Sequence, residues 1–73
     1  MSVEAENARA SFLQAVARYG VQVLSDDGRT IALERDYSVE IEPNGLLKLR
    51  SEGFVVAPFS DSEEVCRFIL ASD

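Results

Sequence analysis

The chain is organised around the stretch from Tyr37 to Ser51, where two runs of alternating apolar and polar residues flank Pro43-Asn44-Gly45. Alternation with a period of two is typical of strands that bury one face. Residues opposite each other in an antiparallel pair share a face, so a turn of the wrong length mixes apolar and charged side chains. A two-residue Asn44-Gly45 turn gives such a mixture, whereas a three-residue loop keeps the two sets apart. The stretch therefore predicts a hairpin closed by a three-residue loop.

This loop length fixes the register of the hairpin. It sets Ile41 opposite Leu47, Val39 opposite Leu49, and Glu40 opposite Lys48 as an outward charge pair. Pro43 suits the first central position of a type I turn, and Gly45 suits the left-handed position that closes the loop. Replacing Gly45 by Val is therefore predicted to cost about 1–2 kcal/mol of stability.

An amphipathic helix is predicted from Val3 to Tyr19. Its apolar residues recur at spacings of three and four, namely Ala8, Phe12, Ala15 and Tyr19, with Leu13 and Val16 beside them. Ser2 is a candidate N-cap, and Gly20 is a candidate left-handed C-cap. The helix has neither the basic face nor the tryptophans of a membrane-surface helix, so we expect its apolar stripe to pack in the core.

Two short strands are predicted next, over residues 21–25 and 29–35, around an Asp26-Asp27-Gly28 loop. A three-residue loop sets Val23 opposite Ile31 and Val21 opposite Leu33. The connection that follows, over residues 34–36, contains no glycine. It leaves two registers open, with either Tyr37 or Val39 opposite Leu33.

A fifth strand is predicted from Phe54 to Phe59, after a Ser51-Glu52-Gly53 turn, and Pro58 marks it as an edge strand. With a three-residue loop, Val55, Ala57 and Phe59 face the helices while Phe54 and Val56 face away. With a two-residue loop, the two sets exchange faces. The strand is apolar on both sides in either register, unlike the strands before it.

The first of these registers predicts a protein-interaction surface on the outer face of the sheet. It consists of Leu46, Lys48, Arg50, Phe54 and Val56. A contiguous apolar patch of this kind is a candidate contact surface in a small protein. The alternative is that the chain end or a neighbouring loop covers it.

A second helix is predicted from Ser60 to Leu70, where Ser60 and Glu63 form a capping box. Val65, Phe68 and Ile69 make its buried stripe. Cys66 lies well inside this helix and no histidine exists to act as its base, so we expect a half-buried structural cysteine rather than a nucleophile.

The predicted architecture is a single α+β domain over residues 1–73. It is a two-layer sandwich of an N-terminal helix, an antiparallel β-meander of four to five strands and a C-terminal helix, with both helices on one face of the sheet. A chain of this length buries only about 60% of the surface that its unfolded form exposes. A partner subunit is the usual remedy when disulfides and metals are lacking.

Composition narrows the classes of function. The chain has 73 residues, a net charge of −6, one cysteine and no histidine. These numbers argue against an intrachain disulfide, a Cys/His zinc cage and a nucleic-acid partner. The chain begins without a signal-peptide pattern and has no apolar run long enough to span a bilayer, so we expect a cytoplasmic protein with no membrane partner.

No catalytic, metal or cofactor motif is visible, so we expect no enzyme activity, no metal ion and no cofactor. Asp26 and Asp27 are a possible metal pair, but an Asp-Gly turn already explains them. Asp61, Glu63 and Glu64 are explained equally well by the chemistry of a helix start. The leading hypothesis is a protein-interaction module or homodimer. The alternative is a small-molecule or metal-binding protein that uses its acidic turns, and a minimal enzyme is the third possibility.

Overall fold

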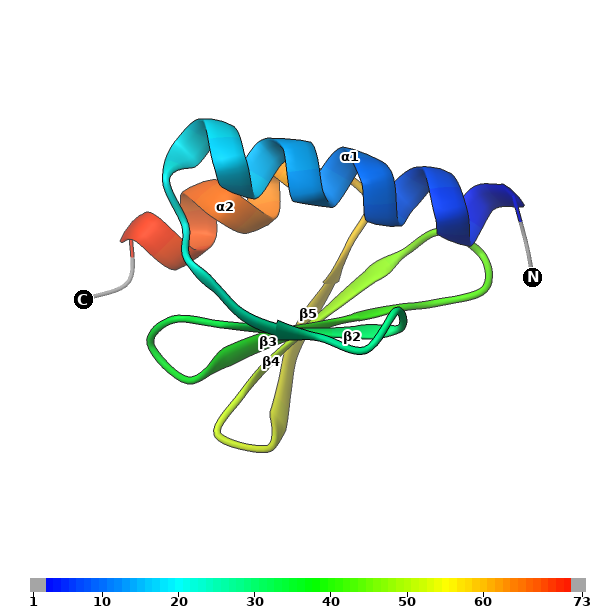
Figure 1. Cartoon of the computed structure of the whole chain (residues 1–73). Helices are drawn as coiled ribbons and strands as arrows, with labels where there is room; N and C mark the ends of the chain where they lie inside the picture. Colours follow the sequence, from blue (N-terminus) through cyan, green and yellow to red (C-terminus); the bar gives the residue numbers. More distant parts are fainter. Residues whose placement is uncertain (1–2, 72–73) are drawn as a thin grey trace.

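The structure is a computed structural model that describes residues 3–71. Its elements, in chain order, are α1 (Val3–Tyr19), β1 (Val23–Asp26), β2 (Thr30–Leu33), β3 (Tyr37–Ile41), β4 (Leu47–Ser51), β5 (Phe54–Phe59) and α2 (Ser62–Ala71). The strands form one antiparallel sheet in the order β1-β2-β3-β4-β5. Both helices cover the same face of this sheet (Figure 1), so the predicted fold class is confirmed. None of the helices in residues 3–71 is long and apolar enough to cross a membrane.

The end of α1 agrees with the sequence. Gly20 has a φ of 76°, and the amide of Val21 donates a hydrogen bond of 2.9 Å to the carbonyl of Val16. This is the pattern of a left-handed glycine cap, and the buried Val16 and Val21 seal it with an apolar contact. The proposed N-cap at Ser2 lies outside the described residues.

The start of α2 differs from the prediction. Asp61, rather than Ser60, is the N-cap, because its Oδ1 accepts a 2.9 Å hydrogen bond from the amide of Glu63. The first helical residue is Ser62, so the N-cap position is residue 61. The predicted capping box between Ser60 and Glu63 is therefore shifted by one residue from the actual start of the helix.

The core lies between the two helices and the inner face of the sheet. It contains thirteen buried residues: Phe12, Ala15, Val16, Val21, Ile31, Leu33, Val39, Ile41, Leu47, Leu49, Val65, Cys66 and Ile69. Cys66 is fully buried rather than half-buried, and it takes the place in the stripe that we expected for Phe68. The ring of Phe68 instead lies at the margin of the core, 6.4 Å from the ring of Tyr37 and 5.8 Å from that of Phe59.

The central hairpin has the predicted register. Ile41 lies opposite Leu47, Val39 opposite Leu49, and Glu40 opposite Lys48. Gly45 has a φ of 88°, and its turn packs against the first turn of α1. A Cβ atom at Gly45 would lie 3.3 Å from both the Cβ and the carbonyl oxygen of Glu4. The glycine is therefore needed for close packing as well as for the turn.

The predicted register of β1 and β2 is wrong. Val23 lies opposite Leu33 and Asp26 lies opposite Ile31, with a β-bulge at position 24. The turn is tighter than expected, because the Asp27 carboxylate accepts hydrogen bonds from the amides of both Arg29 and Thr30. The bulge compensates for this tighter turn, since it returns Val23 to the inner face of the sheet.

The connection between β2 and β3 settles the register that was left open. Ile31 lies opposite Val39, which brings Tyr37 rather than Val39 to the level of Leu33. The turn contains two non-glycine residues with positive φ, Arg35 at 63° and Asp36 at 61°. Its Arg35 guanidinium donates a hydrogen bond of 3.2 Å to the carbonyl of Ile69 near the end of α2.

The β4–β5 hairpin combines the two registers considered for it. Ser51 lies opposite Phe54 and Arg50 opposite Val55, as expected for a two-residue turn. A β-bulge at position 56 then shifts the register, so that Leu49 lies opposite Ala57 and Leu47 opposite Phe59. Ala57 and Phe59 therefore face the helices, as the three-residue loop had predicted.

Candidate interaction surface

Exposed hydrophobic side chains are concentrated on two elements. Five of the seven large ones among residues 3–71 belong to β5 and α2: Phe54 at 76% exposure, Val55 at 51%, Val56 at 41%, and Phe68 and Leu70 at 39% each. We name these five residues the β5–α2 surface. The other two are Val3 at the start of α1 and Leu24 in β1.

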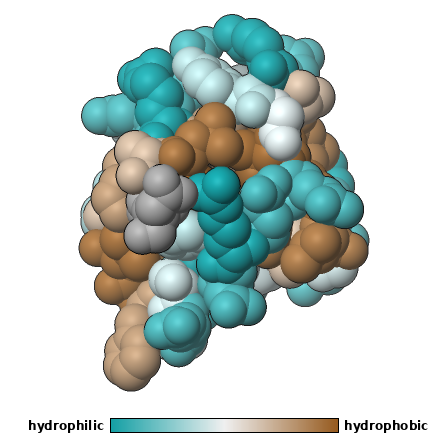
Figure 2. All heavy atoms as spheres, turned by 90° about the vertical axis from the view of Figure 1, so that its left-hand side faces the viewer, coloured by the Kyte–Doolittle hydropathy of each residue, from teal (hydrophilic) through white to brown (hydrophobic). Residues whose placement is uncertain are grey.

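The two elements lie side by side, because α2 packs over β4 and β5. Figure 2 shows hydrophobic surface along the left side of the molecule in that view, reaching down to its lowest point. The lowest point in Figure 1 is the end of the β4–β5 hairpin. The hydrophobic surface therefore extends from the second helix to the tip of the hairpin.

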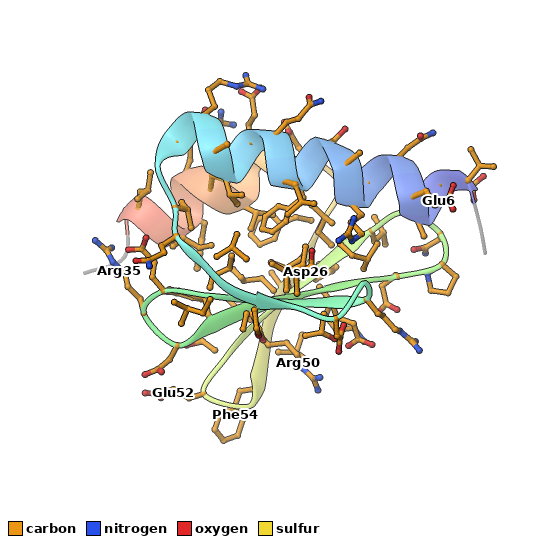
Figure 3. The ribbon with its side chains drawn as sticks, viewed as in Figure 1. Glu6, Asp26, Arg35, Arg50, Glu52 and Phe54 are labelled. Atoms are coloured by element: carbon orange, nitrogen blue, oxygen red, sulfur yellow. The ribbon has the colours of Figure 1, made fainter. Side chains whose placement is uncertain are left out.

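The twist of the sheet explains why the hairpin tip is exposed. Neighbouring strands rotate relative to one another, so β4 and β5 turn progressively away from a helix that lies over the middle of the sheet. Figure 3 shows Phe54 at the end of this hairpin, directed away from both helices. By register Phe54 shares a face with Ser51, but no helix reaches that far to cover it.

The outer face of the sheet is dominated by charge pairs. The Glu40 carboxylate lies 3.5 Å from the Arg50 guanidinium and 3.7 Å from that of Arg29. The Lys48 ammonium lies 2.7 Å from the Glu42 carboxylate. These pairs leave the outer face nearly neutral, in contrast to the chain as a whole.

The residues that we predicted for the interaction surface are spread over several parts of the sheet. Lys48 and Arg50 lie on the outer face, and Leu46 is half-buried in the turn before β4. Phe54 lies at the hairpin tip and Val56 lies at the bulge. Val55, rather than either of them, lies opposite Arg50.

Sequence analysis missed three members of the β5–α2 surface. Val55 was missed because the predicted surface was based on a three-residue loop, whereas the turn has two residues and places Val55 opposite Arg50. Phe68 and Leu70 were missed because helical periodicity does not show how far a sheet extends beneath a short helix. The available signal was the run Phe68-Ile69-Leu70. A helix of this length buries only one stripe, so three apolar residues in a row cannot all be buried.

The two edges of the sheet differ in chemistry. The β1 edge is four residues long, is bulged, and ends in Asp26, whose carboxylate pairs with Arg9 of α1. Short length, a bulge and charge are the usual means of preventing contact at a sheet edge. The β5 edge also has a bulge and contains Pro58, but it is six residues long and has no charged residue. The β5 edge is therefore the more accessible one for an apolar partner.

The acidic turn residues are engaged in structural contacts. Hydrogen bonds from the amides of Thr30 and Arg29 hold the pKa of the Asp27 carboxyl below its usual value. Asp26 accepts a hydrogen bond from Gly28 and pairs with Arg9. Residues 3–71 contain no group of three or more His, Cys, Asp or Glu side chains that could hold a metal ion.

Asp61 and Glu63, at the start of α2, also have structural partners. Asp61 caps the helix. Glu63 accepts a hydrogen bond of 2.9 Å from Arg18 and one of 3.4 Å from the hydroxyl of Tyr19, so it joins α2 to the end of α1.

The thiol of Cys66 is inaccessible to solvent. Burial raises its pKa, and the nearby Glu63 carboxylate raises it further. Because a thiol reacts as the thiolate, both effects reduce its reactivity.

A groove of about 740 Å³ lies at the opposite end of the molecule, between the start of α1 and two of the turns. Its lining includes the apolar side chain of Ile41 and the charged side chains of Glu6, Arg9, Asp27 and Arg29. Charges of both signs therefore surround its apolar floor.

Comparison of this chain with protein-family models, with curated proteins and with solved structures gives no match.

Proposed function

We propose that the protein is a non-enzymatic interaction module that binds a protein partner through the β5–α2 surface. The observation that supports this proposal is the concentration of exposed Phe54, Val55 and Val56 on an uncharged edge strand. Exposing apolar side chains to water is unfavourable, and burial recovers about 25 cal/mol for each Å². Binding of a partner that covers these side chains is favoured by this free energy.

The chemistry of the remaining side chains favours binding over catalysis. The one thiol is buried with a raised pKa, and the acidic residues near it cap or pair. A carboxyl group that acts as a general acid needs a raised pKa, whereas backbone hydrogen bonds lower the pKa of Asp27. The thiol and the acidic side chains therefore stabilise the fold that carries the contact surface.

Site-specific photocrosslinking in cells that naturally produce the protein tests this proposal. A benzophenone amino acid replaces Phe54 in one variant and Leu24 in a matched control. Leu24 is suitable because it is 62% exposed, apolar and also on an edge strand. We expect discrete protein adducts after illumination at position 54 and not at position 24. Absence of adducts at position 54, or the same adducts at both positions, would refute the proposal.

A second candidate function is the binding of a small molecule in the 740 Å³ groove. The volume falls within the range of small-molecule sites, and the apolar floor beside charged groups resembles the usual composition of such sites. A fragment library can be screened by shifts of amide resonances. Binding in the groove would shift the resonances of Arg9, Asp27 and Ile41 together, and a screen in which no fragment does so would remove this candidate.

A further inference from the structure

We infer that the partner on the β5–α2 surface is a second copy of this chain. In the dimer, a two-fold axis passes close to Val56, and β5 runs antiparallel to β5 of the partner. This inference rests on the proposed function and goes further by naming the partner and its orientation. Charge, orientation, closure and area each support this dimer.

The first of these is charge. Each copy has a net charge of −6, so two copies repel each other unless the surfaces that meet are free of acidic residues. Strand β5 has no charged residue between Phe54 and Phe59. The neighbouring outer face is close to neutral because Glu40 and Glu42 are paired with basic side chains. This side of the molecule is therefore where two acidic chains can approach.

The second is orientation. Glu52 lies in the exposed turn at one end of β5, and Lys48 lies opposite Pro58 at the other end. A parallel arrangement brings the two Glu52 carboxylates together, which costs free energy. An antiparallel arrangement separates them and turns each towards the end of the partner where Lys48 and Glu42 pair and leave no net charge. Val56 is the midpoint between Phe54 and Pro58, so it lies nearest the two-fold axis.

The third is closure. Pro58 has no amide proton to donate, and the bulge at position 56 interrupts the strand. Both features limit a backbone ladder between copies, so the side chains of Phe54, Val55 and Val56 supply most of the contact. The β1 edge is bulged and acidic, so a third copy has no comparable edge to join. The result is a closed dimer rather than a filament.

The fourth is area. A specific interface of standard size removes about 800 Å² of surface from each partner. This chain exposes 4430 Å² in total, so an interface of that size would cover about a fifth of its surface. Truncation of a central aromatic residue typically weakens such an interface at least about 10-fold. Phe54, the most exposed of the five side chains, is the residue to truncate.

Sedimentation equilibrium over a wide range of concentration tests the dimer. We expect the wild-type chain to show a reversible monomer–dimer equilibrium. Phe54→Ser should raise its dissociation constant at least about 10-fold, while Leu24→Ser, at the other edge, should leave it unchanged. A wild-type chain that stays monomeric, or a dimer that Phe54→Ser leaves intact, would overturn the inference.

A cysteine at the axis tests the geometry. Disulfides need two Cα atoms about 4.4–6.8 Å apart, so Val56→Cys should form an intermolecular disulfide rapidly under mild oxidation. The native Cys66 does not interfere, because it is buried. Leu24→Cys is the control and should form no intermolecular disulfide under the same conditions. Equal rates of crosslinking for the two variants would contradict the placement of the axis.

The two proposals can fail separately. If the wild-type chain is monomeric at every concentration but position 54 still gives adducts with another protein in cells, the second-copy inference is wrong and the interaction function stands. If the purified dimer forms and position 54 gives only adducts of twice the chain mass, both proposals are supported. A monomer without adducts removes both.

Discussion

Gly45 is the position where the turn of the central hairpin meets the first helix, which makes it a sensitive test of the structure. We expect Gly45→Ala to destabilise the protein more than Gly28→Ala. Both glycines have positive φ, 88° and 95°, so both substitutions introduce the same backbone strain. They differ in their surroundings. A Cβ at Gly45 would lie 3.3 Å from two atoms of Glu4, whereas one at Gly28 would meet nothing within 4 Å.

The magnitudes follow from these two terms. Left-handed backbone costs an alanine about 1–2 kcal/mol, which is the whole loss expected for Gly28→Ala. Crowding in a packed contact adds about 1 kcal/mol at the low end of its usual range, so Gly45→Ala should lose about 2–3 kcal/mol. A domain of this length has a total stability of about 4–11 kcal/mol. The effect at Gly45 is therefore a large fraction of the total.

Urea unfolding followed by circular dichroism measures both variants against the wild-type chain. The dependence of unfolding free energy on urea should be the same for all three, because the folded core is unchanged. In thermal melts, each kcal/mol should lower the midpoint by about 4–8 °C. Equal losses for the two variants would refute the reasoning, since they would mean that the first turn of α1 yields without cost.

The remaining predictions concern α2. Asp61→Ala should lower stability by about 1 kcal/mol in urea unfolding, because it removes the cap on the Glu63 amide, while Ser60→Ala should have little effect. The reverse ranking would restore Ser60 as the cap. Cys66 has a raised pKa in the folded state, so the unfolded chain releases its thiol proton first, at about pH 8.5. The free energy of unfolding of the wild-type chain should therefore be fully retained below that pH and fall as the pH rises towards the pKa of Cys66 in the folded state. The Cys66→Ala variant lacks this thiol, so its free energy of unfolding should fall less steeply between pH 7.5 and 9.5. Alkylation of Cys66 in the native protein should be slow and should accelerate only as urea unfolds the chain, so rapid labelling near neutral pH would contradict its burial. Arg35→Ala should cost about 0.3–1 kcal/mol, because its guanidinium binds a carbonyl near the negative end of α2, and an unchanged melting midpoint would show that this contact adds nothing.

The turns show where sequence reasoning succeeds and where it stops. The loop at Gly45 was predictable because both arms alternate without interruption, so only one register keeps Val39 and Leu49 on the same face. At β1 the apolar pattern is short, and side-chain hydrogen bonds of Asp27 tighten the turn by more than the pattern reveals. The bulge that compensates leaves no mark in the alternation. A two-period pattern therefore specifies a register only where the strands are long enough to reject the alternatives.

The candidate surface shows the same limit. The apolar character of residues 54–59 is plain in the sequence. It was enough to predict that this strand takes part in a contact surface. The sequence left two turn lengths open, and only the structure shows that a two-residue turn places Val55 opposite Arg50 before a bulge at position 56 shifts the register. Nor could the sequence show that Phe68 and Leu70 belong with β5.

The sequence by itself determined the type and order of the elements and left the number of strands at four to five, because periodicity, caps and turn residues act between neighbours in the chain. It also determined the net charge and the absence of a histidine or a second cysteine. Only the tertiary structure decided which apolar side chains stay exposed. That outcome depends on how far the sheet twists beneath two helices of fixed length, and this twist leaves the hairpin that ends at Phe54 uncovered.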